Sequence, residues 1–181
     1  MKSENHILLL TPGFPKDEND YLCTPPIQDY LLKYKGVYPQ TKFSVISFHY
    51  PYEKKNYNWS GISVYALGGN NSAIRKLFIW KNAIKTAKNM DKVLKFSSIH
   101  SLWFGECALV GNHLSKTFGC NHICTLMGQD VSKSNYYLKY LDVITKANYG
   151  IFSVENYRLL ILRHRLFPID YCSDLVPLFS L

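Results

Sequence analysis

One stretch in the middle of the chain, residues 96–130, constrains the fold more than any other. Its first part, residues 96–103, is largely apolar and predicts a buried strand. Residues 107–118 repeat apolar side chains at spacings of three and four, which predicts a helix. Gly119 follows where a left-handed helix C-cap belongs, and residues 122–127 predict a second buried strand. Strand, helix and strand in this order form a βαβ unit, whose two strands run parallel.

The two strand ends of this unit are the first place to expect a functional site. Ligands of parallel α/β sheets bind outside the carboxyl ends of the strands. The candidate residues at these ends are His100, Trp103, Gly105, Glu106, Gly128, Gln129 and Asp130. Several of them also have a purely structural interpretation. His100 suits a buried core, Glu106 suits the first turn of a helix, and Asp130 suits a helix N-cap.

The rest of the chain alternates between strand and helix patterns. Strands are expected at residues 6–10, 43–49, 62–67, 149–154 and 174–178, and helices at residues 27–35, 72–89 and 155–165. Asn71 or Ser72 is expected to cap the second of these helices, and residues 51–59 to form a loop. Such alternation predicts a Rossmann-like, doubly wound, mostly parallel sheet with helices on both faces. We expect one domain over residues 1–181.

Composition narrows the class of protein. With 181 residues, 47% of them hydrophobic, the chain can bury a substantial core. No apolar run approaches the ~20 residues of a membrane span, and no signal-peptide pattern opens the chain, so a cytoplasmic protein is expected. The five cysteines are odd in number and scattered, which favours reduced core residues over a disulfide framework.

The net charge of +8 indicates either that the protein binds an anionic partner or that its positive side chains simply face water. One helix concentrates lysines at alternating spacings of four and three. The residues are Lys81, Lys85, Lys88, Lys92 and Lys95. Such a face binds anionic lipid headgroups when a helix lies on a membrane, and otherwise remains in water. Both interpretations stay open, and the first would place the protein at the inner face of the membrane.

The sequence gives less support to a nucleic-acid partner or to a metal site. No base-reading or stacking motif occurs, so no nucleic-acid partner is expected. Cys120, His122 and Cys124 alternate along one predicted strand and would share a face, as soft metal ligands could. A fourth ligand is missing and the strand is expected to be buried, which favours core cysteines and no metal.

Several short motifs, in order along the chain, are similar to those of one enzyme family. They are TPGFP, DEND and PP in the first third, LGG at residues 67–69, then IHSLWFGECALVG, TLMGQD and FSVEN. This order resembles the N-terminal half of the family-4 glycosyltransferases, which have the two-domain GT-B architecture. The resemblance implies transfer of a sugar from a nucleotide-sugar donor with retention of configuration, without a further cofactor. It implies that this half holds a sugar or glycolipid acceptor.

The resemblance also assigns residues. It implies that Gly13 and Phe14, in the first loop, approach the donor diphosphate, and that Ser153 lies in a strand-to-helix turn at the same cleft. His100 and Glu106 become the candidates for catalysis. The sequence departs from the family where Leu102 replaces a histidine found in many members, and where no E-x₇-E element is present. We therefore expect an acceptor-side half without its donor-binding domain, inactive alone. The alternatives are a non-catalytic binding module and a peripheral membrane protein.

Overall fold

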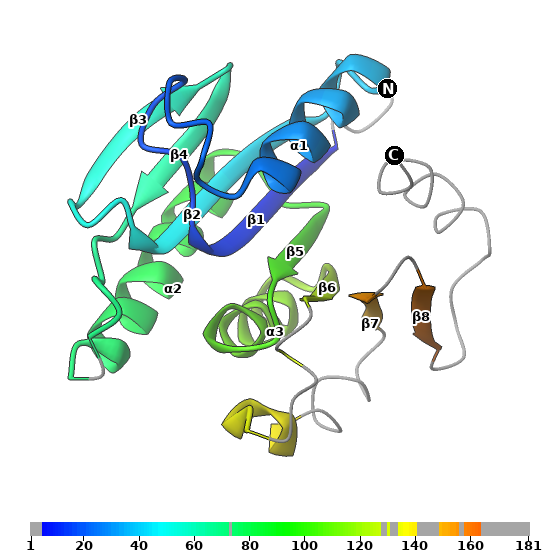
Figure 1. Ribbon diagram of the computed structural model, residues 1–181. Coiled ribbons are helices and arrows are strands. Elements are labelled where there is room, and N and C mark those ends of the chain that lie inside the picture. Colours follow the sequence, from blue (N-terminus) through cyan, green and yellow to red (C-terminus); the bar gives the residue numbers. More distant parts are fainter. Residues whose placement is uncertain are drawn as a thin grey trace.

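The computed structural model describes residues 5–72, 74–127, 130, 134–140, 149–155 and 158–163. Its centre is an eight-stranded sheet in the order β3-β4-β2-β1-β5-β6-β7-β8 (Figure 1). The strands are β1 His6–Gly13, β2 Lys42–Tyr50, β3 Lys55–Trp59, β4 Ile62–Ala66, β5 Ser98–Leu102, β6 Asn121–Met127, β7 Tyr149–Glu155 and β8 Arg158–Arg163. The six inner strands pair in parallel, and β3 and β8 pair antiparallel at the two edges. The doubly wound α/β fold is confirmed.

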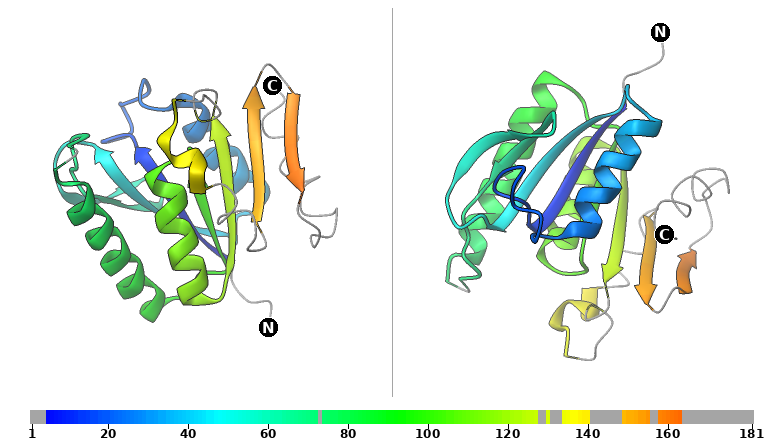
Figure 2. Two further views of the ribbon diagram at one scale, coloured as in Figure 1. Left: turned by 90° about the horizontal axis from the view of Figure 1, so that it is seen from below. Right: turned by 45° about the horizontal axis from the view of Figure 1, so that its top comes forward.

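Helices cover both faces of this sheet (Figure 2). Helix α1 (Pro25–Val37) packs on one face, where Ile27 and Leu31 join Leu9 and Val45 in an apolar core. Helices α2 (Lys76–Val93) and α3 (Glu106–Phe118) pack on the other face, against Leu8, Ile46 and their neighbours. Alternate residues of each strand therefore enter different cores.

The βαβ unit over β5, α3 and β6 is confirmed. Strands β5 and β6 pair in parallel, and Gly119 takes a φ of 67° at the C-cap of α3. Gly111 explains how closely α3 approaches the sheet, because a Cβ added there would lie 2.3 Å from Ser101 Oγ and 2.5 Å from His122 Nε2. Any larger residue at position 111 would push the helix away from the sheet.

Three expectations about elements are wrong. Residues 51–59 are not a loop throughout, because β3 pairs with β4 across a two-residue turn in which Ser60 and Gly61 both have positive φ, as type I′ hairpins require. Residues Arg158–Arg163, expected in a helix, form strand β8, since their apolar run pairs with β7. Helix α2 begins at Lys76, with Arg75 at the N-cap and no capping side chain.

Two further expectations concern the strand at residues 174–178 and membrane-spanning helices. The strand expected at residues 174–178 lies outside the described residues. In the part of the chain that the structure describes, no helix is both long and apolar enough to cross a membrane.

Candidate functional site

A cleft of about 410 Å³ lies where β1, β2 and β5 end. Pro12 comes from β1, His49 from β2, and Trp103 from the turn after β5. The short helix η2 (Tyr136–Tyr140) and the residues before it form the remaining wall. The described lining is completed by Phe48, Asn71, Phe104, Gly105, Glu106, Cys107, Asp130, Ser134, Asn135 and Tyr137. The cleft thus occupies the carboxyl ends of the strands, as expected for a parallel sheet.

Glu106, the first residue of α3, is the most strongly contacted acid of the cleft. Its Oε2 accepts a hydrogen bond of 2.7 Å from Trp80 Nε1, and its Oε1 lies 3.0 Å from Lys76 Nζ. His49 Nε2 lies 3.6 Å from the same Oε1. Only 13% of the Glu106 side chain is exposed, so these three partners replace most of its water.

The surroundings of Glu106 keep it ionised. Burial by itself raises the pKa of the carboxyl, but His49, Trp80 and Lys76 together outweigh burial and lower that pKa to about 2. The amino end of helix α3 favours the same charge. Glu106 is therefore a fixed carboxylate near neutral pH, able to accept hydrogen bonds from a ligand.

Lys76 connects Glu106 to the opposite wall of the cleft. Its Nζ donates a hydrogen bond of 3.0 Å to the Tyr137 hydroxyl, in addition to the ion pair with Glu106. The hydrogen bond to Tyr137 is the main cause that raises the pKa of Lys76 above its usual value. The anion that lines the cleft thus has a cation directly beside it, although Lys76 itself is not among the described lining residues.

Trp103 has an unusual backbone conformation at the end of β5. Its φ is 67°, a left-handed conformation that costs a bulky residue about 1–2 kcal/mol. Two backbone hydrogen bonds fix this turn, from Trp103 N to Thr125 O (3.0 Å) and from Gly105 N to Trp103 O (3.1 Å). Strain of this kind concentrates at functional sites, where it places a side chain that ordinary geometry would turn elsewhere.

Asp130 lines the cleft, but its hydrogen bonds serve to stabilise the cleft wall. Its Oδ2 accepts a hydrogen bond of 2.7 Å from the backbone N–H of Phe104. Asn135 Nδ2 donates to Phe104 O (2.9 Å) and to Asp130 O (2.8 Å). These bonds tie the turn after β5 to the segment before η2. Asp130 acts here as a positioning residue.

His100 lies on the other face of the sheet, away from the cleft. It is 4% exposed, its Nε2 lies 2.7 Å from Thr125 Oγ1, and its ring meets Tyr30 of α1 edge to face at 5.8 Å. Burial lowers the pKa of this imidazole to about 4. His100 is not among the described residues that line the cleft, and its position favours the core interpretation over catalysis.

The first loop also differs from what the resemblance implies. Phe14 is fully buried and meets Trp59 edge to face at 5.2 Å, so it cannot contact a ligand in the cleft. Gly13 is half-buried and does not line the cleft in the described part of the chain, although Pro12 does. The loop beyond is held to the side of β2, where the Tyr50 hydroxyl donates to Asp20 Oδ2 (2.7 Å).

The remaining candidates can be placed only in part. Gly105 lines the cleft, as predicted. Gly128 and Gln129 lie outside the described residues. Ser153 lies in β7, where its backbone pairs with Leu126 and Leu160. The strand-to-helix turn expected there is wrong, because β7 leads into β8.

Sequence reasoning missed one residue that lines the cleft, His49, and one that pairs with Glu106 from beside the cleft, Lys76. His49 lies near the end of β2, so the rule applied to the ends of β5 and β6 would have found it. Gly69 shows how tightly its imidazole is enclosed, since a Cβ there would lie 2.6 Å from His49 Nδ1. Lys76 has no such signal, because only the fold brings the start of α2 next to Glu106.

The alternating residues Cys120, His122 and Cys124 do not form a metal site. Across the described ranges, no group of three or more His, Cys, Asp or Glu side chains could hold a metal ion. His122 Nε2 instead lies 2.8 Å from Ser101 Oγ, inside the core beneath α3.

Comparison with known proteins identifies the fold. No family model matches the chain, and no curated protein matches it. Among solved structures, sucrose-phosphate synthase from Thermosynechococcus elongatus is similar with a TM-score of 0.58 and 12% identity, over 81% of this chain and 41% of that chain. TubZ of Clostridium botulinum phage c-st is similar with a TM-score of 0.53 and 9% identity, over 99% of this chain and 59% of that chain.

A third similar structure is a UGT transferase from Siraitia grosvenorii in complex with UDP. Its TM-score is 0.45 at 9% identity, over 67% of this chain and 24% of that chain, which is too weak to support an argument. The chain therefore spans well under two thirds of each of these proteins. The comparisons show a Rossmann-like α/β fold of the kind present in a solved glycosyltransferase, and the site itself must supply the argument for function.

Proposed function

We propose that this chain is the acceptor-side half of a glycosyltransferase that transfers sugar from a nucleotide-sugar donor with retention. Three observations support the proposal. The fold is similar to part of sucrose-phosphate synthase, and the motif order resembles the N-terminal half of family-4 enzymes. The cleft lies at the carboxyl ends of β1, β2 and β5, where this fold class binds its ligands.

The observation that carries the proposal is the arrangement around Glu106. The Glu106 carboxylate offers acceptors to sugar hydroxyls, and the adjacent Lys76 ammonium group and the Asn71 amide offer donors, whereas the Asn135 amide is occupied by Phe104 and Asp130. Trp103 and Tyr137 add aromatic rings, which pack against the apolar faces of sugars. The cleft suits a polar, neutral ligand with many hydroxyl groups.

The chemistry also limits what Glu106 does. A general base works best when its pKa lies near the operating pH, whereas the pKa of Glu106 is about 2. We assign Glu106 to binding and orienting an acceptor hydroxyl, and not to proton transfer. In the proposed transfer the bond from the sugar to the nucleotide diphosphate breaks as the bond to the acceptor oxygen forms, and the departing diphosphate takes the proton of the acceptor hydroxyl. The proposed donor-binding domain, supplied by another part of the protein or by a separate chain, would hold that diphosphate.

A binding experiment tests this function. Amide chemical shifts of the ¹⁵N-labelled chain would be followed during titration with glucose, maltose, sucrose, UDP-glucose, ADP-glucose and GDP-mannose. We expect at least one sugar-containing ligand to shift the amides of residues 103–106 and 134–137, with no transfer of sugar by the chain alone. Shifts confined to other regions with every ligand would refute the proposal. Binding without transfer when a donor-binding partner is supplied would favour the non-catalytic module.

A second candidate function is supported by the surface of helix α2. Lys81, Lys85, Lys88 and Lys92 are all exposed, which agrees with the predicted lysine face. The same helix begins with exposed apolar side chains, because Ile74, Leu77 and Phe78 are 96%, 75% and 63% exposed. Apolar residues next to lysines are typical of surfaces that bind anionic membranes. We propose that this surface brings the protein to the cytoplasmic face of a membrane that carries a glycolipid acceptor.

Vesicle co-sedimentation tests the membrane surface. We expect the chain to bind vesicles of phosphatidylglycerol and phosphatidylcholine, and to lose that binding in 0.5 M salt or on the changes Lys81→Gln, Lys85→Gln and Lys88→Gln, because screening and loss of charge act on the same attraction. The matched control changes three lysines away from this helix, Lys33, Lys42 and Lys55, to glutamine. Equal binding by both triple variants would refute this surface.

A further inference from the structure

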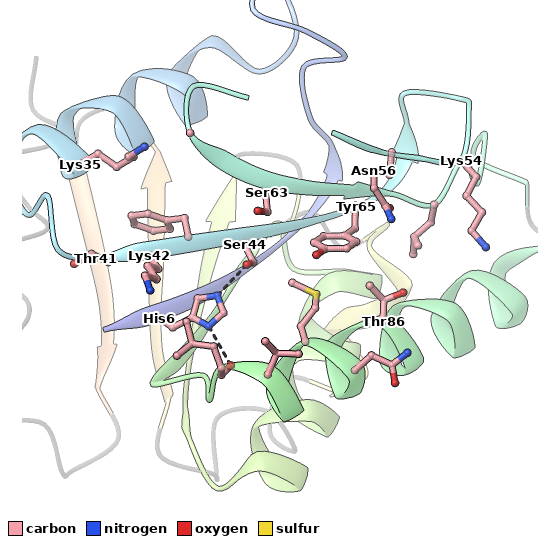
Figure 3. Close-up of a pocket in the computed structure, with 18 of the residues that line it drawn as sticks. His6, Lys35, Thr41, Lys42, Ser44, Lys54, Asn56, Ser63, Tyr65 and Thr86 are labelled. Carbon is pink, nitrogen blue, oxygen red and sulfur yellow. Dashed lines mark hydrogen bonds between the residues drawn. The ribbon is translucent and has the colours of Figure 1, made fainter. Parts of the chain in front are cut away.

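A second hollow, larger than the cleft around Glu106, lies near the edge of the sheet that β3 and β4 form. It has a volume of about 790 Å³ and is bounded by β2 and β4 on one side and by α2 on the other (Figure 3). None of its described lining residues belongs to the cleft around Glu106. Its floor is the part of the sheet that α2 leaves uncovered, where Ser44, Ser63 and Tyr65 face the hollow. We call this hollow the β4 groove.

Strand register explains why polar side chains collect on this floor. Ser44 pairs with Ser63, and Ile46 pairs with Tyr65, so these residues point to the same face of the sheet. Asn56 of β3 pairs with Tyr65 and adds an amide to the same face. From the other wall, α2 contributes Thr86 and Asn89. The groove therefore presents hydroxyl and amide groups around one half-buried aromatic ring.

Lysines lie at both ends of the β4 groove. Lys35 donates a hydrogen bond of 2.8 Å to Ser60 O, next to the start of β4. Lys54 precedes Lys55, which pairs with Ala66 at the end of β4. Lys35 and Lys54 thus lie beyond opposite ends of β4, whose four steps from Ile62 to Ala66 span about 13 Å. Figure 3 shows Lys35 and Lys54 on opposite sides of Tyr65, with Lys42 near the His6 end.

The charge of this groove has one sign. Lys35, Lys42 and Lys54 line it, and no aspartate or glutamate is among its described lining residues. His6 is occupied in the structure, since its Nδ1 donates to Leu94 O (3.2 Å) and its Nε2 lies 2.9 Å from Ser44 Oγ. In a neutral imidazole the second nitrogen then accepts the proton of the Ser44 hydroxyl, which leaves the lone pairs of Ser44 available as acceptors.

We propose that the β4 groove binds an acidic oligosaccharide. Hydroxyl and amide groups bond to sugar hydroxyls, the face of Tyr65 packs against a sugar ring, and lysines at the two ends pair with acidic groups on separated sugars. An open groove suits a chain longer than a monosaccharide. Single-stranded nucleic acid fits less well, because such sites stack successive bases on several aromatic rings, and Tyr65 is the one half-exposed aromatic ring among the described lining residues.

Two double variants of equal net charge test the assignment. Lys35→Glu with Lys54→Glu reverses both ends of the groove, whereas Lys81→Glu with Lys85→Glu makes the same change in charge on the exposed face of α2, outside the groove. The probes are fluorescein-labelled tetragalacturonate and a labelled heparin tetrasaccharide, with maltotetraose and a thymidine 12-mer as competitors. Thermal unfolding confirms that each variant is folded.

We expect at least one acidic tetrasaccharide to bind the unaltered chain, with neither competitor displacing it at equal concentration. The groove variant should bind about tenfold more weakly than the α2 variant, because it loses two charge-assisted contacts. Tyr65→Leu, which keeps an apolar side chain at the floor, should also weaken binding. Equal loss in the two double variants, tighter binding of the thymidine 12-mer, or no binding of either acidic probe would overturn the proposal. These variants leave the Glu106 cleft unchanged, so failure here is separate from failure of the transferase proposal.

Discussion

Two histidines, His49 and His100, lie on neighbouring parts of one sheet and have opposite surroundings. His49, near the end of β2, lies 3.6 Å from the carboxylate of Glu106 and lines the cleft. His100, inside β5, faces α1 and is enclosed by Tyr30 and Thr125. Both residues sit in strands that a strand-end rule would select. The difference is what each ring faces: His49 faces Glu106 at the start of α3, whereas His100 faces the core beneath α1.

The largest expected difference between the two histidines is in how much each contributes to the free energy of unfolding. His100→Ala should lower the free energy of unfolding by about 3–4 kcal/mol, because it opens a cavity against Tyr30 and leaves the Thr125 hydroxyl without its buried partner. Chemical denaturation measures the change. His113→Ala is the matched control, since His113 is exposed on α3 and should change stability by less than about 0.5 kcal/mol. A loss of under 1 kcal/mol at His100 would contradict its burial.

The pH dependence of stability is the next largest effect. Because burial holds the pKa of folded His100 near 4, the unfolded chain takes up the proton first once the pH falls below about 6.5. The free energy of unfolding should therefore fall between pH 6.5 and pH 4, by up to about 3 kcal/mol from His100. His100→Phe should make this fall smaller without abolishing it, because burial also lowers the pKa of His122, to about 3, and His113→Gln should leave the profile unchanged. Parallel profiles for all three proteins would refute the assignment.

Glu106 should show a pH dependence of the same sign, in a lower pH range. Its folded pKa lies below the ordinary value, so its stabilisation is present above about pH 4.5 and is lost as the pH falls toward 2. Glu106→Gln should lower the free energy of unfolding by about 2 kcal/mol at pH 7 and by much less at pH 3. Denaturation of both proteins at the two pH values measures this. A difference that does not depend on pH would mean that packing, and not charge, holds Glu106.

His49 should matter least for stability. His49→Ala removes a buried side chain that lines the cleft and should cost about 1–2 kcal/mol, because the space it leaves opens into the cleft and the contact from Asn71 N to His49 Nδ1 (3.3 Å) is lost. Thermal unfolding measures the change. A cost as large as that of His100→Ala would show that His49 too is a core residue.

Local patterns in the sequence were sufficient for much of the fold. The alternation of strands and helices and the left-handed Gly119 predicted the βαβ unit at the centre of the sheet. The β3–β4 hairpin was missed although its Ser60-Gly61 turn is a recognisable signal. Strand β8 could not be distinguished from a helix, because a short apolar run fits both and only its pairing with β7 decides.

The site was predicted less completely than the fold. Glu106, Trp103, Gly105 and Asp130 do line one cleft, since strand ends of a parallel sheet meet at one edge. His100 was assigned to that cleft because its position along a strand was considered without the direction of its side chain, and Phe14 because the resemblance placed the first loop at the cleft. The partners Lys76 and Tyr137 are distant in sequence, and only tertiary structure brings them to Glu106.

Ligand affinity in two histidine variants tests the central claim, that the functional cleft is the one around His49 and Glu106. The sugar-containing ligand that binds most tightly in the chemical-shift titration would be measured by calorimetry against His49→Ala and His100→Phe. We predict about tenfold weaker binding for His49→Ala, equal to the loss of one charge-assisted or well-placed polar contact, and less than about twofold change for His100→Phe. Stronger loss in His100→Phe than in His49→Ala would contradict the account and return the site to the other face of the sheet.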